Sequence, residues 1–376
     1  MIYKDFQGLK LSALGLGTMR LPVIDGKNGQ IDEDATAKMI ALALEKGINY
    51  FDTAWMYHEY MSEVVVGKIL KQYPRDSFCL ATKFPGMNPQ NREDPSVIFE
   101  KQLEKCQVEY FDFYLVHNLN EKSIDAYLDD GDKVMPYLLE QKAKGRIRHL
   151  GLSAHSTTET LRRFLDKWGE HIEFCQIQLN YIDWNLQRAS ERVALLNERN
   201  VPIWVMEPLR GGKLATISEA NTAKLNALRP DEGVPAWGFR YLQSIPGVTM
   251  VLSGMSNEQQ LLDNIATFSE DKPLNDAEMA CLMEIAQEMS GGVPCTACRY
   301  CTTVCPMGLE IPELLQLYNE YVFSNSMFIA HNVSEMDKEK RPSACLGCHA
   351  CERMCPQNIQ IAAVLADFDE KLAKRG

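Results

Sequence analysis

The 376-residue sequence lacks a surplus of basic residues, since 39 Lys and Arg stand against 51 Asp and Glu and give a formal net charge of -12. Proteins that bind nucleic acid neutralise phosphates with clustered Lys and Arg. No basic run of that kind occurs, so we expect no nucleic acid among the partners.

Long apolar runs are also missing. No stretch approaches the 18 uninterrupted apolar residues that a membrane-spanning helix needs, and residues 1–10 contain no apolar signal core. Apolar residues nevertheless make up 45% of the chain and charged residues 24%, which excludes a disordered protein. We therefore expect a globular protein of the cytoplasm, neither exported nor membrane-embedded.

Cysteine, by contrast, is abundant, with twelve residues. In a chain of this length inside the cell, where thiols are kept reduced, many cysteines indicate metal binding before disulfides. Four are scattered and read as ordinary packed thiols: Cys79, Cys106, Cys175 and Cys281. The other eight fall into two short windows, each spaced C-x2-C-x2-C-x3-C and followed by proline: Cys295, Cys298, Cys301 and Cys305, then Cys345, Cys348, Cys351 and Cys355.

Both windows match the ferredoxin pattern that holds 4Fe-4S clusters, in which the fourth cysteine of each window ligates the other cluster. One predicted ligand set is therefore Cys295, Cys298, Cys301 and Cys355, and the other is Cys345, Cys348, Cys351 and Cys305. Structural zinc is the alternative, but zinc sites usually pair two short knuckles across a longer loop. His349 lies inside the second window as a neighbour of a set that already has four thiolates.

The windows begin 50 residues apart (345 − 295), farther than in small bacterial ferredoxins. Residues 311–323 between them have apolar positions at helical spacing, so a mostly helical two-cluster domain is expected. Residues 324–343 are polar and charged near their end, and we interpret them as a solvated loop.

Before the cysteines, short β-rich runs alternate with longer amphipathic stretches such as 32–47 and 95–108, which is typical of parallel βα units. Eight such runs predict a TIM (β/α)8 barrel. They are residues 11–17, 47–53, 78–84, 111–117, 147–153, 174–180, 202–208 and 248–254. A doubly wound sheet is the main rival, but no G-x-G-x-x-G follows the first run. The predicted domains are a barrel over 1–275, a connecting helix or linker over 276–290, and a ferredoxin-like domain over 291–376.

Chemistry in such barrels takes place at the C-terminal ends of the strands. Asp52, Lys83 and His117 end three predicted strands, and Tyr57 lies in the loop after the strand that Asp52 ends. A lysine lowers the pKa of a nearby phenol, and an aspartate can keep that lysine charged. Each residue alone has an ordinary structural explanation, but the four together predict an acid-base site at which His117 orients a carbonyl oxygen.

These features resemble the aldo-keto reductase family. The resemblance is carried by GLGTMRL (15–21), FDTAWMYHEYMSEVVVGKIL (51–70), ATKF (81–84) and YLVHN (114–118). It implies the family's catalytic tetrad at Asp52, Tyr57, Lys83 and His117, with Tyr57 protonating a carbonyl while a nicotinamide delivers hydride.

The resemblance also implies a dinucleotide site. Ser153 and Gln176 would hold the carboxamide, Pro208 to Gly211 would pass the pyrophosphate, and residues 254–264 would wrap the adenosine phosphate. The implied contacts are Gly17, Thr18, Met19, Asp52, Ser153, Gln176, Pro208, Leu209, Gly211, Gly254, Ser256, Gln260 and Asn264.

The chain departs from many relatives at four of these places. Ala154 stands where they have Asn, and Met206 where they have an aromatic residue. Gly254 and Gln260 replace the Lys and Arg that grip the 2′-phosphate in some members. NADP(H) is expected and NAD(H) is possible.

A hydride carries two electrons whereas a 4Fe-4S cluster passes one, so the role of the clusters stays open at this point. The leading hypothesis is an NAD(P)H-dependent reductase of carbonyls whose ferredoxin module exchanges electrons with a redox partner protein or a second cofactor, and flavin is not excluded. The alternatives are an electron-transfer protein with the barrel as a docking or sensing scaffold, and a reductase whose clusters are structural. Near the site, His58 is expected on the loop surface, while Trp55 and His155 are candidates for the pocket wall.

Overall fold

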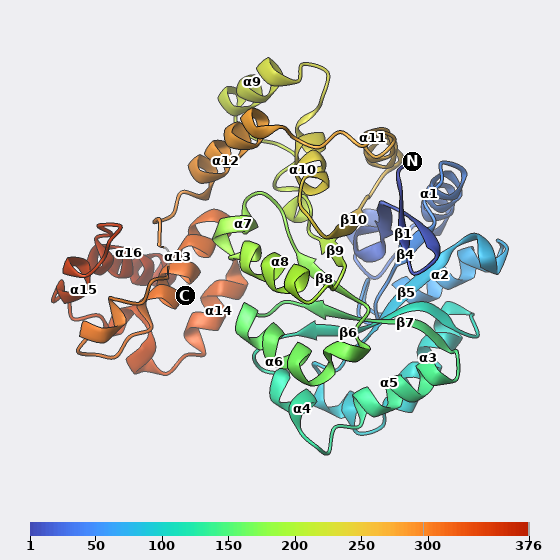
Figure 1. Ribbon diagram of the computed structural model, residues 1–376, viewed down its shortest axis with the longest axis horizontal. Coiled ribbons are helices and arrows are strands. Elements are labelled where there is room, and N and C mark those ends of the chain that lie inside the picture. Colours follow the sequence, from blue (N-terminus) through green and yellow to red (C-terminus); the bar gives the residue numbers. More distant parts are fainter. Residues whose placement is uncertain (296, 375–376) are drawn as a thin grey trace. The chain divides into compact units, whose positions relative to one another are not determined.

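The computed structural model describes residues 1–295 and 297–374 (Figure 1). The chain divides into two compact units, the first made of 1–180 and 189–279 and the second of 181–188 and 280–376. The division falls inside α12 (Asp276–Ser290). Within the described residues, no helix combines the length and the apolar character needed to cross a membrane.

The first unit is built on a closed ring of eight strands, each parallel to its neighbours, in the order β10-β3-β4-β5-β6-β7-β8-β9. The strands are β3 (Leu14–Gly17), β4 (Tyr50–Asp52), β5 (Cys79–Phe84), β6 (Phe111–Leu119), β7 (Ile147–Ala154), β8 (Phe174–Gln178), β9 (Ile203–Met206) and β10 (Val248–Gly254). Each lies within one of the predicted runs or overlaps it by all but one or two residues. The predicted TIM barrel is therefore confirmed.

The first predicted run, 11–17, is not one strand. It is split between β2 (Leu9–Ser12), which pairs antiparallel with β1 (Tyr3–Phe6), and the barrel strand β3. Phe6 and Leu11 of this hairpin are buried against Phe113, Phe174 and Trp204 inside the barrel. Because the hairpin supplies apolar side chains to the barrel core, that end of the barrel is filled.

Helices follow the strands and lie outside the ring (Figure 1). Those of the first unit are α1 (Glu33–Glu45), α2 (Ser62–Leu70), α3 (Pro95–Cys106), α4 (Ile124–Leu128), α5 (Val134–Ala143), α6 (Thr158–Trp168), α8 (Ala189–Glu198), α9 (Glu219–Leu228), α10 (Val234–Gln243) and α11 (Glu258–Thr267). Local sequence sets their starts. Asp32 caps α1 by accepting from the Ala35 N–H, and Asp94 caps α3 just before Pro95, whose missing N–H costs nothing at a first helical position.

The second unit is helical. Besides α7 (Asp183–Leu186), it contains α13 (Ile311–Ser324), α14 (Met327–Ser334), α15 (Ala350–Arg353) and α16 (Ile361–Ala373). Two matching segments start at Ile311 and Ile361, again 50 residues apart, and α13 packs against α16. Their apolar faces form one core with Cys301 and Cys351. The expected mostly helical C-terminal domain is confirmed.

One prediction for this unit is wrong. Residues 324–343, interpreted as a solvated loop, contain α14. Ser326 caps the helix by accepting from the Phe328 N–H, and Ile329 and Val333, four residues apart, bury one face against Phe368. The polar composition of the segment concealed this short amphipathic pair.

Candidate functional site

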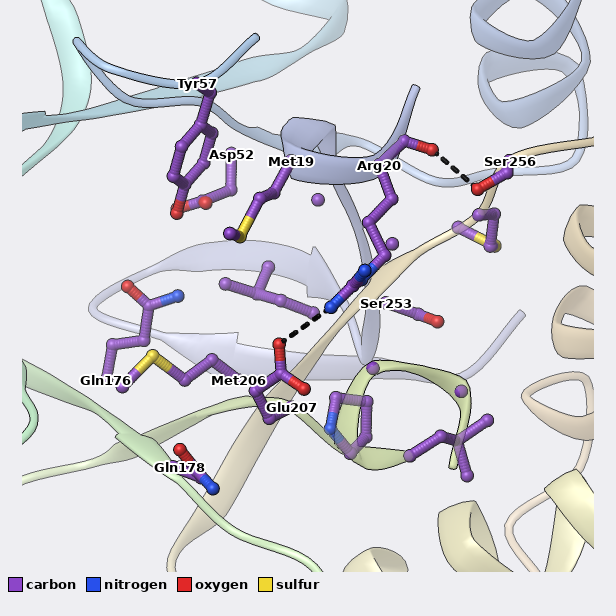
Figure 2. Close-up of a pocket in the computed structure, with 18 of the residues that line it drawn as sticks. Met19, Arg20, Asp52, Tyr57, Gln176, Gln178, Met206, Glu207, Ser253 and Ser256 are labelled. Carbon is purple, nitrogen blue, oxygen red and sulfur yellow. Dashed lines mark hydrogen bonds and ion pairs between the residues drawn. The ribbon is translucent and has the colours of Figure 1, made fainter. Parts of the chain in front are cut away.

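A cavity of about 700 Å³ opens at the C-terminal ends of the barrel strands (Figure 2). It is bounded by the segments that follow β3, β4, β6, β8, β9 and β10. Most of the residues predicted for catalysis or cofactor binding line it: Gly17, Met19, Asp52, Tyr57, His117, Gln176, Pro208, Leu209, Gly211, Gly254, Ser256, Gln260 and Asn264. The strand-end rule thus brings distant parts of the sequence to one cavity.

Lys83 connects two of the predicted catalytic residues from behind. Its Nζ lies 2.5 Å from Asp52 Oδ1 and 3.2 Å from Tyr57 Oη, and it also donates to the Thr53 carbonyl oxygen at 2.9 Å. The side chain is only 1% exposed. Lys83 therefore cannot be a solvated surface charge, and its three donors are committed to the phenol, the carboxylate and the backbone.

Burial and charge oppose each other in this group. Burial by itself would lower the pKa of Lys83, but Asp52 and Tyr57 raise it above its usual value, so the ammonium stays charged at neutral pH. Burial raises the pKa of Asp52 despite the opposing ammonium. The same holds for Tyr57, whose pKa is raised by burial more than Lys83 lowers it. The sequence-based expectation that lysine lowers the phenol's pKa omitted this larger effect of burial.

His117 ends its part of the wall as a neutral ring. Burial lowers its pKa well below the usual value, and the positive charge of Lys83 lowers it further. The ring stands edge-to-face with Tyr57, with centroids 6.2 Å apart. Its Nδ1 is buried and has no hydrogen-bond partner within the described residues. An imidazole in this state can exchange a hydrogen bond with a polar atom bound beside Tyr57.

Ser153 and Gln176 present further unused polar atoms. They are opposite each other in the ladder between β7 and β8. The Ser153 Oγ and the Gln176 Oε1 are both buried without a partner in the part of the chain that the structure describes. Buried polar atoms are normally hydrogen-bonded, so such a pair at a cavity indicates a missing ligand group. A carboxamide, which offers both donors and an acceptor, fits these two atoms.

Thr18 does not line the cavity, unlike its neighbours in sequence. It is fully buried, its Oγ1 donates to the Asp52 carbonyl oxygen at 2.9 Å, and it lies 2.7 Å from the Ser62 Oγ. Instead of offering a contact to a ligand, Thr18 holds the end of β4 against the start of α2.

His58 is buried, so its predicted place on the loop surface is wrong. Its Nε2 accepts from the Leu21 N–H at 3.1 Å, and its Nδ1 lies 2.8 Å from the Asn28 carbonyl oxygen, so it ties the loop after Tyr57 to the segment after β3. Trp55 is not among the lining residues, and its ring lies against Lys105 Nζ at 4.4 Å. His155 does line the cavity.

Sequence reasoning missed several lining residues. Asn118 and Gln178 come from the ends of β6 and β8, where the same strand-end rule could have found them. Met56 and Met87 lie in loops whose course no local pattern predicts. Together with Met19 and Met206 they give the wall flexible thioether side chains, which adapt to ligands of different shape.

In the second unit, the eight window cysteines surround two small separate cavities. One is lined by Cys295, Cys298, Cys301 and Cys355, and the other by Cys305, Cys345, Cys348 and Cys351. In each, the fourth thiol comes from the opposite window, which is the crossed arrangement of a two-cluster ferredoxin. All eight are free thiols, and Cys305 Sγ accepts from the Leu309 N–H at 3.4 Å. His349 is largely exposed and bonds to Glu352.

Comparison with known protein families gives two matches. The aldo/keto reductase family matches residues 13–287, and the 4Fe-4S dicluster domain matches residues 294–359. Similar curated proteins include the NADH-specific methylglyoxal reductase of Escherichia coli, 25% identical over 328 residues that cover 75% of this chain and 96% of the relative. The probable aldo-keto reductase 1 of Glycine max is 30% identical over 215 residues, which cover 55% of this chain and 58% of the relative.

Solved structures agree on the fold. The holo form of the aldo-keto reductase AKR11C1 from Bacillus halodurans has a TM-score of 0.60 and 26% identity, covering 76% of this chain and 96% of that one. An aldo-keto reductase from Klebsiella pneumoniae in complex with NADP and acetate has a TM-score of 0.60 and 21% identity, covering 74% and 93%. Because the family match spans the barrel, this chain belongs to the aldo/keto reductase family of oxidoreductases and carries a 4Fe-4S dicluster domain C-terminal to that barrel.

Proposed function

We propose that the barrel interconverts a small carbonyl compound and its alcohol with a nicotinamide nucleotide, and that Asp52, Tyr57, Lys83 and His117 are the catalytic residues. The observation that carries this proposal is the contact of Lys83 Nζ with both Asp52 Oδ1 and Tyr57 Oη at the base of the cavity. The holo and NADP-bound states of the solved relatives support the cofactor class.

The residues divide the work of carbonyl reduction. When bound, the reduced nicotinamide supplies a hydride to the carbonyl carbon. Tyr57 holds its proton at neutral pH, because burial raises its pKa, and donates that proton from Oη to the carbonyl oxygen. Lys83 remains charged beside the phenol and stabilises the phenolate that is left. The neutral ring of His117 orients the carbonyl oxygen against Tyr57.

Ser153 and Gln176 would hold the carboxamide of the nicotinamide, since their free polar atoms match its donors and acceptor. The segment from Pro208 to Gly211 would pass the pyrophosphate. Gly211 has φ of +65°, and a Cβ there would meet the Arg20 guanidinium at 2.7 Å, so a residue without a side chain is required at this point.

We propose further that residues 291–376 form a ferredoxin-like domain that binds two 4Fe-4S clusters and exchanges single electrons with a redox partner protein or a second cofactor. Its support is the two crossed sets of thiols, each around a cavity of its own. Residues 1–275 would then be the reductase domain and 276–290 the connection between the two.

The variant Tyr57→Phe tests the proposed chemistry. We expect loss of at least about 100-fold in kcat for a panel of aldehydes, because the general acid is removed, while cluster absorption and reduction by dithionite are unchanged. Tyr60→Phe is the matched control, since it removes a phenol from the same loop at an exposed position outside the cavity. Undiminished turnover by Tyr57→Phe would favour a barrel that serves only as a docking or sensing scaffold.

Anaerobic mixing tests whether the domains communicate. The holoprotein is mixed with NADH or NADPH and the visible absorption of the clusters is followed, with dithionite as the reference for full reduction. Bleaching by a nicotinamide nucleotide would show electron exchange with the barrel's cofactor. Bleaching by dithionite alone would assign the exchange to a separate partner. A Cys298→Ser, Cys348→Ser double variant with undiminished turnover in every assay would make the clusters structural.

A further inference from the structure

We propose that the end of the cavity formed by residues 254–264 selects NAD(H) over NADP(H), with Gln260 and Asp263 as the residues that determine this choice. The proposal rests on the proposed function, because it assigns the nucleotide end of the same cavity. The difference between the two nucleotides is one phosphate at the 2′-oxygen of the adenosine ribose. A site for that phosphate needs donors and positive charge.

The backbone donors at this end are already occupied. α11 begins here, and the N-terminus of a helix binds phosphate through its free N–H groups. In this chain, however, Gln260 Oε1 accepts from the Ser256 N–H at 2.8 Å, and Asn257 Oδ1 accepts from the Gln260 N–H at 2.9 Å. The Ser256 hydroxyl donates to the Arg20 carbonyl oxygen at 2.8 Å. A phosphate would have to displace acceptors that belong to the protein itself.

Positive charge is also directed away from this end. Among the described residues that line the cavity, Arg20 is the only Lys or Arg. Its guanidinium pairs with Glu207 Oε1 at 3.5 Å, beside the loop after β9, while its backbone lies next to Ser256 (Figure 2). The stem of Arg20 covers Gly254, where a Cβ would lie 3.2 Å from three of its carbons. A lysine at position 254 would therefore have to displace Arg20.

The charge that does face this end is negative. Asp263 lines the cavity one helical turn after Gln260. Its Oδ1 accepts from the Gln259 Nε2 at 2.8 Å, which holds the carboxylate in place. A carboxylate is a good acceptor for the ribose 2′-hydroxyl and repels a 2′-phosphate, which is how acidic residues favour NAD in other dinucleotide sites. Occupied donors, a diverted arginine and a fixed carboxylate thus point to the same nucleotide.

The test is direct binding to the full-length protein with its clusters. Dissociation constants for NADH and NADPH are measured by quenching of tryptophan fluorescence, at low and at high salt. We expect NADH to bind at least about tenfold more tightly. Asp263→Asn should tighten NADPH several-fold without tightening NADH, and the added Gln260→Arg should reverse the preference because it frees the Ser256 N–H and supplies a guanidinium.

Glu258→Gln is the matched control, because Glu258 is an exposed carboxylate in the first turn of α11 that does not line the cavity. It should leave the ratio of the two dissociation constants unchanged. NADPH binding as tightly as NADH to the wild-type protein would overturn the proposal and leave the proposed function intact. An equal shift in Glu258→Gln and Asp263→Asn would overturn the assignment to Asp263. If neither nucleotide binds, the proposed function itself fails.

Discussion

Lys83 Nζ lies 3.2 Å from Tyr57 Oη, and the phenol nevertheless keeps a raised pKa. The reason is that the ammonium is shared with Asp52, while the cavity wall removes the phenol from water. The contact therefore serves the product of proton transfer more than the starting acid. Tyr57 is protonated when a carbonyl arrives, and the phenolate is stabilised once it forms.

The neutral state of His117 leads to a prediction about pH. Its pKa is lowered well below the usual value by burial and by Lys83, so the ring stays neutral as the pH falls through about 6.5. The kcat/KM for carbonyl reduction should therefore be flat from about pH 8 to below pH 6.5, and the raised pKa of Tyr57 should keep the acid protonated over that range. Initial rates at saturating nucleotide measure this profile. An acid limb near 6.5 that disappears in His117→Asn would contradict it.

The crossed cysteine sets lead to a prediction about iron content. Cys298 and Cys355 line one cavity, whereas Cys305 lines the other. Replacing both Cys298 and Cys355 by serine should remove one cluster, leaving about four irons per chain, because both substitutions affect the same cubane. Replacing Cys298 and Cys305 should affect both clusters. Iron analysis with electron paramagnetic resonance of the reduced protein distinguishes the two pairs, and greater iron loss in the first pair than in the second would refute the crossed ligation.

Glu173, at the start of β8, leads to a prediction about stability. Burial would raise its pKa, but hydrogen bonds from His149, from Lys142 and from the Leu150 N–H lower it to about 2. A depressed carboxylate pKa stabilises the folded state above the unfolded pKa of about 4.3, and this contribution is lost as the pH falls toward 2. Glu173→Gln should lower the free energy of unfolding by about 2 kcal/mol at pH 7.

Urea denaturation measures that loss across pH. The deficit of Glu173→Gln should shrink as the pH falls from about 5 toward 3, because the wild-type carboxyl then becomes neutral in the unfolded chain. Glu170→Gln, at an exposed position three residues earlier, should differ little from wild type. A deficit independent of pH would mean that the packing of Glu173, and not its charge, stabilises the barrel.

The eight strands were predictable because parallel barrel strands are buried on both faces and give continuous apolar runs. The same runs placed Asp52, Lys83 and His117 at strand ends, and the cysteine spacing gave both ligand sets. The burial of His58 was not predictable, since it depends on backbone groups of Leu21 and Asn28 that no local pattern brings near it. The raised pKa of Tyr57 likewise depends on how tightly the loop closes over the ring.

The account depends most on the role of Lys83 in hydride chemistry, and Lys83→Met tests it directly. Single-turnover rates of NADH or NADPH oxidation by an aldehyde are measured anaerobically, together with the dissociation constant of the nucleotide and the thermal unfolding midpoint. We predict a loss of at least about 1,000-fold in the rate, because phenolate stabilisation is removed, with the nucleotide still bound and the protein still folded. A folded, nucleotide-bound Lys83→Met protein that turns over at the wild-type rate would contradict the account.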